Sequence, residues 1–274
     1  MTAEEVARVA LAEDLGERGD VSGRAALPHD REAAGEIVSR ADGVLAGTEV
    51  ADAVADLMGL RLTWRAGDGS PAAPGVSVCR VTGPARALLA GERTMLNLLC
   101  RLSGVASLTA RYVAACAPVA VLDTRKTTPG LRALEKAAVR AGGGRNHRAG
   151  LHDGVMFKDN HLALLDGDLA AAVARARAEL PGAPVEIEAD DLDGVLAALA
   201  AGADWILLDN MDTTTMRDAV EVVAGRARTE ASGGMTLERA RAASTTGVDA
   251  ISIGALTHSA PALDLGLDLD LGGA

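Results

Sequence analysis

Six short apolar runs recur after Pro118, and their spacing restricts the possible folds more than any other feature of the chain. Each run ends in polar residues or glycine, and most lead into an alanine-rich segment of helical character. Strands that alternate with helices in this way are predicted to form a parallel sheet with crossover helices. The runs are Val119–Asp123, Gly154–Lys158, Val185–Glu188, Trp205–Asp209, Arg228–Ser232 and Ala250–Gly254.

An open doubly wound sheet and a closed barrel both fit this alternation. The first run is not followed by the GxGxxG fingerprint of a dinucleotide-binding fold, and the three glycines at 142–144 do not match it. The pattern therefore predicts an α/β domain of either kind.

The first 100 or so residues mix helix and strand without regular alternation, which predicts a separate α+β domain. Thr2 and Glu5 match a capping box at the start of a helix. The glycines from Gly16 to Gly23 then interrupt the helical pattern.

Further along this domain, strands are expected within 34–46 and 75–82, with a helix at about 47–58 between them. From about residue 86 to 116 the chain is predicted to be mostly helical, with an interruption near Ser103-Gly104. This long segment is expected to join the two domains.

Composition and charge exclude several classes of partner. The 274 residues carry a formal net charge of −11, with only two tryptophans, one tyrosine and one phenylalanine. An acidic chain with so few aromatic rings is poorly suited to nucleic acid or an anionic membrane. The three cysteines form no CxxC motif, so neither a disulfide framework nor a zinc site is expected.

The location of the protein is also predicted from its apolar runs. None of them approaches the roughly 18 residues of a membrane span. The acidic N-terminal segment lacks the plan of a signal peptide. We therefore expect a soluble, cytoplasmic protein.

Polar residues and a glycine stand at nearly constant spacing where four of the runs end. Glu188, Asp209, Ser232 and Gly254 are separated by 21, 23 and 22 residues. In barrels and in open α/β sheets, the active site lies at the carboxyl edge of the strands. These four positions are therefore predicted to share one rim with the residues that follow the first two runs.

Basic residues are concentrated around the first two runs. Residues 120–160 contain eight lysines and arginines and four acidic residues, a balance of +4 in a chain of −11. Arg125, Lys126 and Lys158 adjoin apolar runs, where a charge needs a partner. Arginine suits a carboxylate and lysine suits a pyrophosphate, so the rim is predicted to bind both kinds of anion.

Glycine-rich turns follow the last two runs. Ser232-Gly233-Gly234 and Gly254 each precede a segment of helical character. Backbone N–H groups in such turns bind phosphate, although a plain turn is the alternative interpretation.

Acidic and histidine side chains complete the candidate site. Glu188 and Asp209 are candidate Mg²⁺ ligands or partners of sugar hydroxyls. The alternative is that they cap the helices that follow. His147 and His258 lie in candidate site loops, where a structural role is equally open.

The rim residues also form longer motifs. DTRKTTPGLR (123–132) and GGGRNHR (142–148) resemble the signature of the quinolinate phosphoribosyltransferase family. GERTMLN (91–97), VEIEADDLD (185–193) and EASGGM (230–235) are similar to further family segments, so the resemblance covers nearly the whole chain.

The resemblance implies an α/β fold of two domains. An N-terminal open α/β sandwich would comprise residues 1–105 and be rejoined by 262–274. An incomplete, TIM-like α/β barrel would comprise 106–261 and carry most of the active site.

The resemblance also implies an activity. The family transfers phosphoribose from 5-phosphoribosyl-1-pyrophosphate to quinolinate with decarboxylation, giving nicotinate mononucleotide, pyrophosphate and CO₂ for NAD biosynthesis. Mg²⁺ is the implied cofactor, and the implied assembly is a homodimer that exchanges an arginine between subunits. Neither nucleic acid nor a membrane is an expected partner.

Position by position, the resemblance assigns a role to each residue that matches a family motif. By this transfer, quinolinate would be bound by Arg125, His147, Arg148, Lys158 and the partner-donated Arg93. The catalytic residues around ribose, pyrophosphate and metal would be Lys126, Glu188 and Asp209, with the metal on Glu188 and Asp209. The 5′-phosphate would be bound by Ser232, Gly233, Gly234, Gly254 and His258.

Alternative functions remain at this point. Paralogues linked to molybdate transport genes and nicotinate phosphoribosyltransferase share the fold. A Schiff-base lyase using Lys126 or Lys158, and a non-catalytic anion-binding barrel, belong to other classes. The combination of Arg93, Arg125, Arg148 and Lys158 favours a dicarboxylate over a monocarboxylate.

Overall fold

The computed structural model describes residues 1–165 and 168–270, and the chain divides into two compact units. The sandwich unit comprises Met1–Ala110, Thr127–Gly143 and Leu256–Ala274. The barrel unit comprises Arg111–Lys126 and Gly144–Ala255. Each unit is described by itself below.

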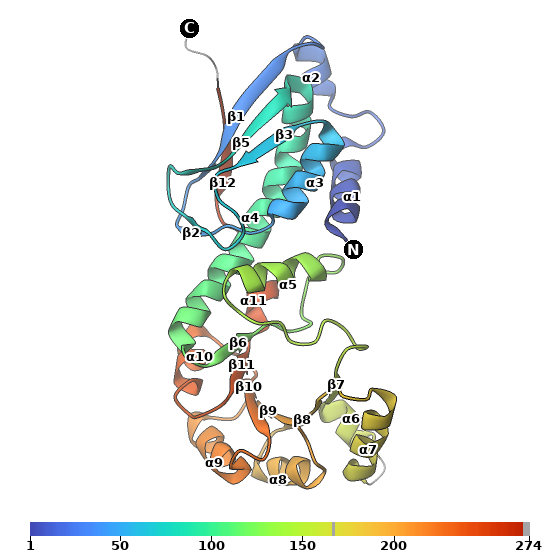
Figure 1. Ribbon diagram of the computed structural model, residues 1–274, viewed down its shortest axis with the longest axis vertical. Coiled ribbons are helices and arrows are strands. Elements are labelled where there is room, and N and C mark those ends of the chain that lie inside the picture. The colour runs from blue at the N-terminus through green and yellow to red at the C-terminus, as the bar shows by residue number, and fades with distance from the viewer. Residues whose placement is uncertain (166–167, 271–274) are drawn as a thin grey trace. The chain divides into compact units, whose positions relative to one another are not determined.

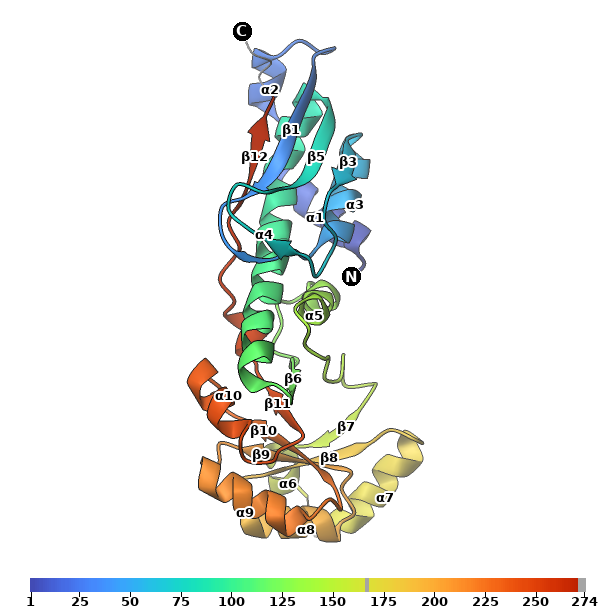
Figure 2. The same cartoon turned by 60° about the vertical axis from the view of Figure 1, so that its left-hand side comes forward.

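The sandwich unit is built on an antiparallel sheet with strand order β12-β1-β5-β3 (Figure 2). Strand β12, near the end of the chain, pairs with β1 from the beginning, with Gly35 opposite Leu269. A separate two-stranded ribbon is formed by β2 and β4. The bounds are β1 Glu32–Ser39, β2 Gly43–Val44, β3 Arg61–Trp64, β4 Pro71–Ala72, β5 Ser77–Pro84 and β12 Leu265–Leu269.

Helix α1 (Ala3–Leu15) begins at the predicted capping box. Glu5 N donates to Thr2 Oγ1 at 3.2 Å, and Thr2 N donates to Glu5 Oε2 at 2.8 Å. Gly16 ends the helix as expected. The expected interruption up to Gly23 is too long, because Asp20 accepts from Gly23 N and caps a short helix, α2 (Val21–Ala26).

Helix α3 (Thr48–Met58) matches its expected position, whereas α4 (Ala85–Cys116) corrects the prediction. The expected break near Ser103-Gly104 is wrong, because α4 is continuous there. Ser103 Oγ exchanges hydrogen bonds with the backbone of Ala46 at 3.0 and 3.1 Å. A Cβ on Gly104 would lie 2.0 Å from Pro261 O, so this glycine permits close packing instead of ending a helix.

The barrel unit holds a six-stranded parallel sheet with strand order β6-β11-β10-β9-β8-β7 (Figure 1). All six predicted strands are confirmed, three of them shorter than the apolar runs. Since β6 and β7 stand at opposite ends of the order, the sheet is an incomplete barrel. The bounds are β6 Ala120–Leu122, β7 Val155–Phe157, β8 Val185–Ala189, β9 Trp205–Asp209, β10 Arg228–Ser232 and β11 Ala250–Ser252.

Helices α7, α8 and α9 run along one face of this sheet in both views (Figures 1 and 2). Asp168, Asp191, Asp212 and Thr236 cap four of the crossover helices by accepting backbone N–H groups. The remaining helices are α5 Arg132–Ala141, α6 Asp159–Ala163, α7 Leu169–Glu179, α8 Leu192–Ala200, α9 Thr213–Val223, α10 Leu237–Ala243 and α11 Ala255–His258.

The central strands are buried on both faces, as is usual for parallel sheets. Every residue of β8 is buried, and Ile206, Leu207 and Leu208 fill the middle of β9. Because all six strands are parallel, their carboxyl ends lie at one edge of the sheet. This edge is where barrels place their active sites. Within residues 1–165 and 168–270, we find no helix with the length and hydropathy needed to cross a membrane.

Candidate active site

A cavity of about 300 Å³ lies at the carboxyl ends of the barrel strands. It brings together six of the residues that the sequence predicted for the site: Arg125, Lys126, His147, Arg148, Lys158 and Ser232. The other lining residues are Thr124, Met156, Leu207, Glu230 and Ser252.

The end of β6 fixes the segment that carries two of these residues. Arg145 N donates to Val121 O at 2.8 Å, and Asp123 N donates to Arg145 O at 3.1 Å. The fully buried Asp123 accepts from His147 N at 2.9 Å and from the side chain of Asn146. No role was predicted for Asp123 beyond its place on the rim, although a carboxylate directly after an apolar run is a recognisable signal.

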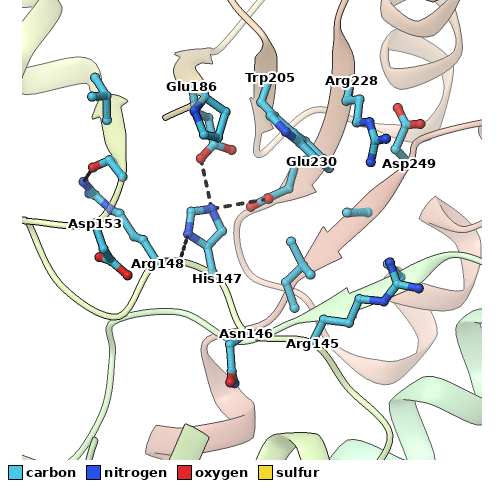
Figure 3. Close-up of a pocket in the computed structure, with 16 residues that line it drawn as sticks. Arg145, Asn146, His147, Arg148, Asp153, Glu186, Trp205, Arg228, Glu230 and Asp249 are labelled. Carbon is cyan, nitrogen blue, oxygen red and sulfur yellow. Dashed lines mark hydrogen bonds and ion pairs between the residues drawn. The ribbon is translucent and has the colours of Figure 1, made fainter. Parts of the chain in front are cut away.

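His147 is held between two buried glutamates that the sequence did not identify (Figure 3). Its Nε2 lies 2.9 Å from Glu186 Oε2 and 3.5 Å from Glu230 Oε2. Its Nδ1 accepts from Arg148 N at 2.7 Å. Because Nδ1 is an acceptor, the ring hydrogen is on Nε2 and faces the glutamates.

Arg148 is half-buried beside the cavity. Its guanidinium donates to Gly154 O at 3.2 Å and contacts Met156 Sδ at 3.5 Å. Burial and the neighbouring positive charge of Arg125 lower the pKa of this guanidinium. Two such cations in one cavity are stabilised by an anionic ligand.

Lys158 and Glu188, predicted for different substrates, form an ion pair. Lys158 Nζ lies 2.6 Å from Glu188 Oε2, and the side chains are 45% and 7% exposed. A buried carboxylate needs such a partner. The pair therefore joins the cationic cavity to the acidic part of the rim.

Three carboxylates at the ends of β8 and β9 are arranged as a metal-binding group. One oxygen each from Glu188, Asp190 and Asp209 lies within 4.8 Å of the other two. All the donors are carboxylate oxygens, which are the ligands that Mg²⁺ prefers. The set fits the expected cofactor. It includes Asp190, which the sequence pattern did not suggest.

The turn after β10 requires its glycines. Gly233 has φ +89°, and a Cβ there would lie 2.3 Å from Asn210 Oδ1. Gly234 has φ +53°, and Gly254 follows β11 at the neighbouring strand end. Only glycine combines this conformation with such a close approach, so Asn210 packs directly against the backbone of this turn.

Arg93 and His258 belong to the sandwich unit. Arg93 lies on α4 with 66% of its side chain exposed, 3.8 Å from Glu92. His258 ends α11 and its Nδ1 lies 2.6 Å from Ser259 Oγ. Their roles stay predictions.

Comparisons with known proteins identify the family to which the chain with this cavity belongs. Two family models match the chain: the N-terminal domain of quinolinate phosphoribosyl transferase over residues 20–103, and its C-terminal domain over residues 105–268. The nicotinate-nucleotide pyrophosphorylase [carboxylating] of Mycobacterium leprae is 44% identical over 276 residues, with 97% of each chain covered.

Two other similar proteins have the same kind of name as the M. leprae relative. The probable nicotinate-nucleotide pyrophosphorylase [carboxylating] of Bacillus subtilis is 41% identical, with 94% of this chain and 90% of that one covered. The crystal structure of nicotinate-nucleotide pyrophosphorylase from Ehrlichia chaffeensis is 35% identical, has a TM-score of 0.93, and matches over 98% of this chain and 99% of that one. From its sequence, its fold and these matches along nearly its whole length, the chain belongs to the quinolinate phosphoribosyltransferase family.

Proposed function

We propose that this protein transfers phosphoribose from 5-phosphoribosyl-1-pyrophosphate to quinolinate with decarboxylation, as a step of NAD biosynthesis. The products are nicotinate mononucleotide, pyrophosphate and CO₂. The observation that carries this proposal is the cavity in which Arg125, Arg148 and Lys158 converge within a chain of net charge −11. A pyridine dicarboxylate suits such a cavity because each of its carboxylates needs cationic partners.

Quinolinate binds to the cationic wall in this proposal. Arg125 and Arg148 supply planar guanidinium groups, and Lys158 supplies an ammonium group. The ring of His147, held through Asp123 and the two glutamates, closes the cavity on one side. In the proposed complex, the pyridine nitrogen faces the ribose carbon C1.

The phosphoribosyl donor occupies the opposite part of the rim. Lys126 follows β6 as an exposed point charge and stabilises the departing pyrophosphate. The backbone of the turn at Ser232-Gly233-Gly234, together with Gly254, receives the 5′-phosphate.

Mg²⁺ is bound by Glu188, Asp190 and Asp209 in this proposal. The support is the cluster of carboxylate oxygens described above. When bound, the ion offsets negative charge on the pyrophosphate leaving group.

Substitution at C1 requires no covalent protein nucleophile. Positive charge develops on the ribose as its bond to pyrophosphate lengthens, and Glu188 and Asp209 stabilise that charge. The pyridine nitrogen then bonds to C1. The bond between C2 and its carboxylate breaks next, leaving its electron pair on C2 beside the positively charged ring nitrogen.

We expect direct assay to test this function. Purified protein mixed with Mg²⁺, phosphoribosyl pyrophosphate and quinolinate should release CO₂ and pyrophosphate in equal amounts. Nicotinate in place of quinolinate is the control, because it lacks the second carboxylate that the cationic cavity is proposed to bind. Pyrophosphate release with nicotinate alone would assign the chain to the other substrate.

We also propose a cytoplasmic homodimer in which Arg93 of each subunit completes the site of the other. The family resemblance and the exposed position of Arg93 on α4 support this proposal. In a symmetric dimer, each interface contact occurs twice. Each chain then provides a barrel to one site and an arginine to the other.

Mixing two inactive variants tests this exchange. Arg93→Ala and Lys126→Ala should each be nearly inactive alone. Once subunits exchange, half of the dimers are mixed, and each mixed dimer has one site with both residues intact, so activity should return to about a quarter of the wild-type value. Activity in the mixture that equals the sum of the separate variants would place Arg93 and Lys126 of one chain in the same site.

A further inference from the structure

A second cavity of about 300 Å³ lies at the amino ends of the barrel strands (Figure 3). Ala120, Trp205, Arg228 and Ala250, which begin β6, β9, β10 and β11, all line it. The two cavities have three lining residues in common: His147, Arg148 and Glu230.

Glu230 therefore reaches both cavities from the interior of β10. The neighbouring Glu186, from β8, lines the second cavity. Glu230 is only 1% exposed, and among the described residues its Oε1 has no hydrogen-bond partner. A buried carboxyl oxygen in this position is available to a group bound in the substrate cavity.

The surroundings of Glu230 favour its protonated form. Burial and the carboxylate of Glu186 raise the pKa of Glu230 to about 8. The opposing effects of His147 beside it, Ser252 on β11 and Lys158 at the end of β7 are smaller. At neutral pH this side chain is thus a carboxylic acid with a proton to give.

The reaction proposed above needs such an acid. Loss of CO₂ leaves an electron pair on C2 of the pyridine ring, and nicotinate mononucleotide carries a hydrogen at that carbon. We infer that Glu230 is the general acid that protonates C2. The electron pair on C2 forms the new C–H bond, and Glu230 is left as a carboxylate.

The second cavity completes the cycle. The Glu230 carboxylate must recover a proton before the next turnover, while the substrate cavity is closed by products. Water in the second cavity supplies it, because Glu230 lines that cavity as well as the substrate cavity. Placement between two cavities separates proton delivery from proton recovery.

Glu230→Gln tests this inference, which rests on the proposed function. In a single turnover followed by rapid quenching, pyrophosphate release should stay within about threefold of wild type. CO₂ formation should slow by about a hundredfold, the scale of general acid catalysis. The mononucleotide that still bears both carboxylates should accumulate, because an unprotonated carbanion recaptures CO₂.

Matched controls separate the possible failures. Glu221→Gln changes an exposed glutamate on α9 and should leave both rates unchanged. Quinolinate binding measured by calorimetry shows whether Glu230→Gln is folded. CO₂ formation that keeps pace with pyrophosphate release in this variant would refute Glu230 as the acid. A wild-type protein that releases no pyrophosphate with quinolinate would instead refute the proposed function.

The pH dependence of the wild-type protein is an independent measurement. The protonated form of Glu230 is the active one, so the rate of CO₂ formation should be constant below pH about 8 and fall about tenfold per pH unit above it. Removing the neighbouring charge with Glu186→Gln should move this decline to lower pH. The same pH profile of CO₂ formation in the wild-type protein and in Glu186→Gln would contradict the inference.

Discussion

Replacing Lys126 with alanine is expected to lower kcat by about 10²- to 10³-fold, while the affinity for quinolinate changes little. Loss of one fixed charge that stabilises a transition state costs about 2.7 to 4 kcal/mol. Lys126 is one of only three lysines in the chain and lines the cavity at the end of β6. Steady-state kinetics with saturating phosphoribosyl pyrophosphate, combined with calorimetry for quinolinate, separates the two effects.

Lys126→Arg is the matched control for this prediction. Arginine keeps the positive charge but replaces a compact ammonium with a planar fork. We expect its activity to lie between those of the wild type and the alanine variant. Full activity would show that any cation suffices at this position. A fall of less than about threefold in Lys126→Ala, well below the tenfold change that 1.36 kcal/mol represents, would remove Lys126 from the chemical step.

The barrel strands and their rim were predictable because both depend on short-range pattern. Most of these runs are apolar and long enough to cross a sheet once, and a polar residue or glycine marks where each one ends. Arg228–Ser232 has only one apolar residue, and its spacing from the neighbouring runs indicated a strand. Trp205–Asp209 and Arg228–Ser232 match the observed strands residue for residue. Glu188 and Asp209 then share one edge because parallel strands place their carboxyl ends together.

The partners of His147 were not predictable in this way. Glu186 lies two positions before Glu188, so both side chains point to the same face of β8. Whether a glutamate on that face is solvated or buried depends on what the neighbouring strands and loops bring to it. His147 comes from a loop about 40 residues before Glu186, and Glu230 comes from a strand about 40 residues after it. No local sequence pattern predicts that these three side chains are in contact.

The error at Ser103-Gly104 has a similar origin. A serine followed by glycine weakens a helix when only its own neighbours are considered. In the folded protein, Ser103 bonds to the backbone of Ala46 and Gly104 allows Pro261 to approach. These tertiary contacts stabilise the helical conformation, and their positions in the chain are remote.

Replacing Arg148 with alanine should produce the largest loss of quinolinate binding among the barrel residues. Its guanidinium is oriented by Gly154 O and Met156 Sδ, so little side-chain freedom is lost when a carboxylate binds. Truncating one partner of a buried, hydrogen-bonded charge pair costs about 2 to 4 kcal/mol, or about 30- to 1000-fold in Kd. Calorimetric titration with quinolinate alone measures this change without turnover.

Two further variants show whether the effect belongs to the guanidinium. Arg148→Lys keeps a charge but loses the planar fork, so its affinity should lie between those of the wild type and Arg148→Ala. Arg241→Ala removes an exposed guanidinium from α10 of the same unit and should leave the affinity within about twofold. Because burial and Arg125 both disfavour the charged form of Arg148, a bound dicarboxylate offsets this repulsion more than a monocarboxylate does. Arg148→Ala should therefore weaken quinolinate more than nicotinate, and equal losses for both ligands would place Arg148 away from the second carboxylate.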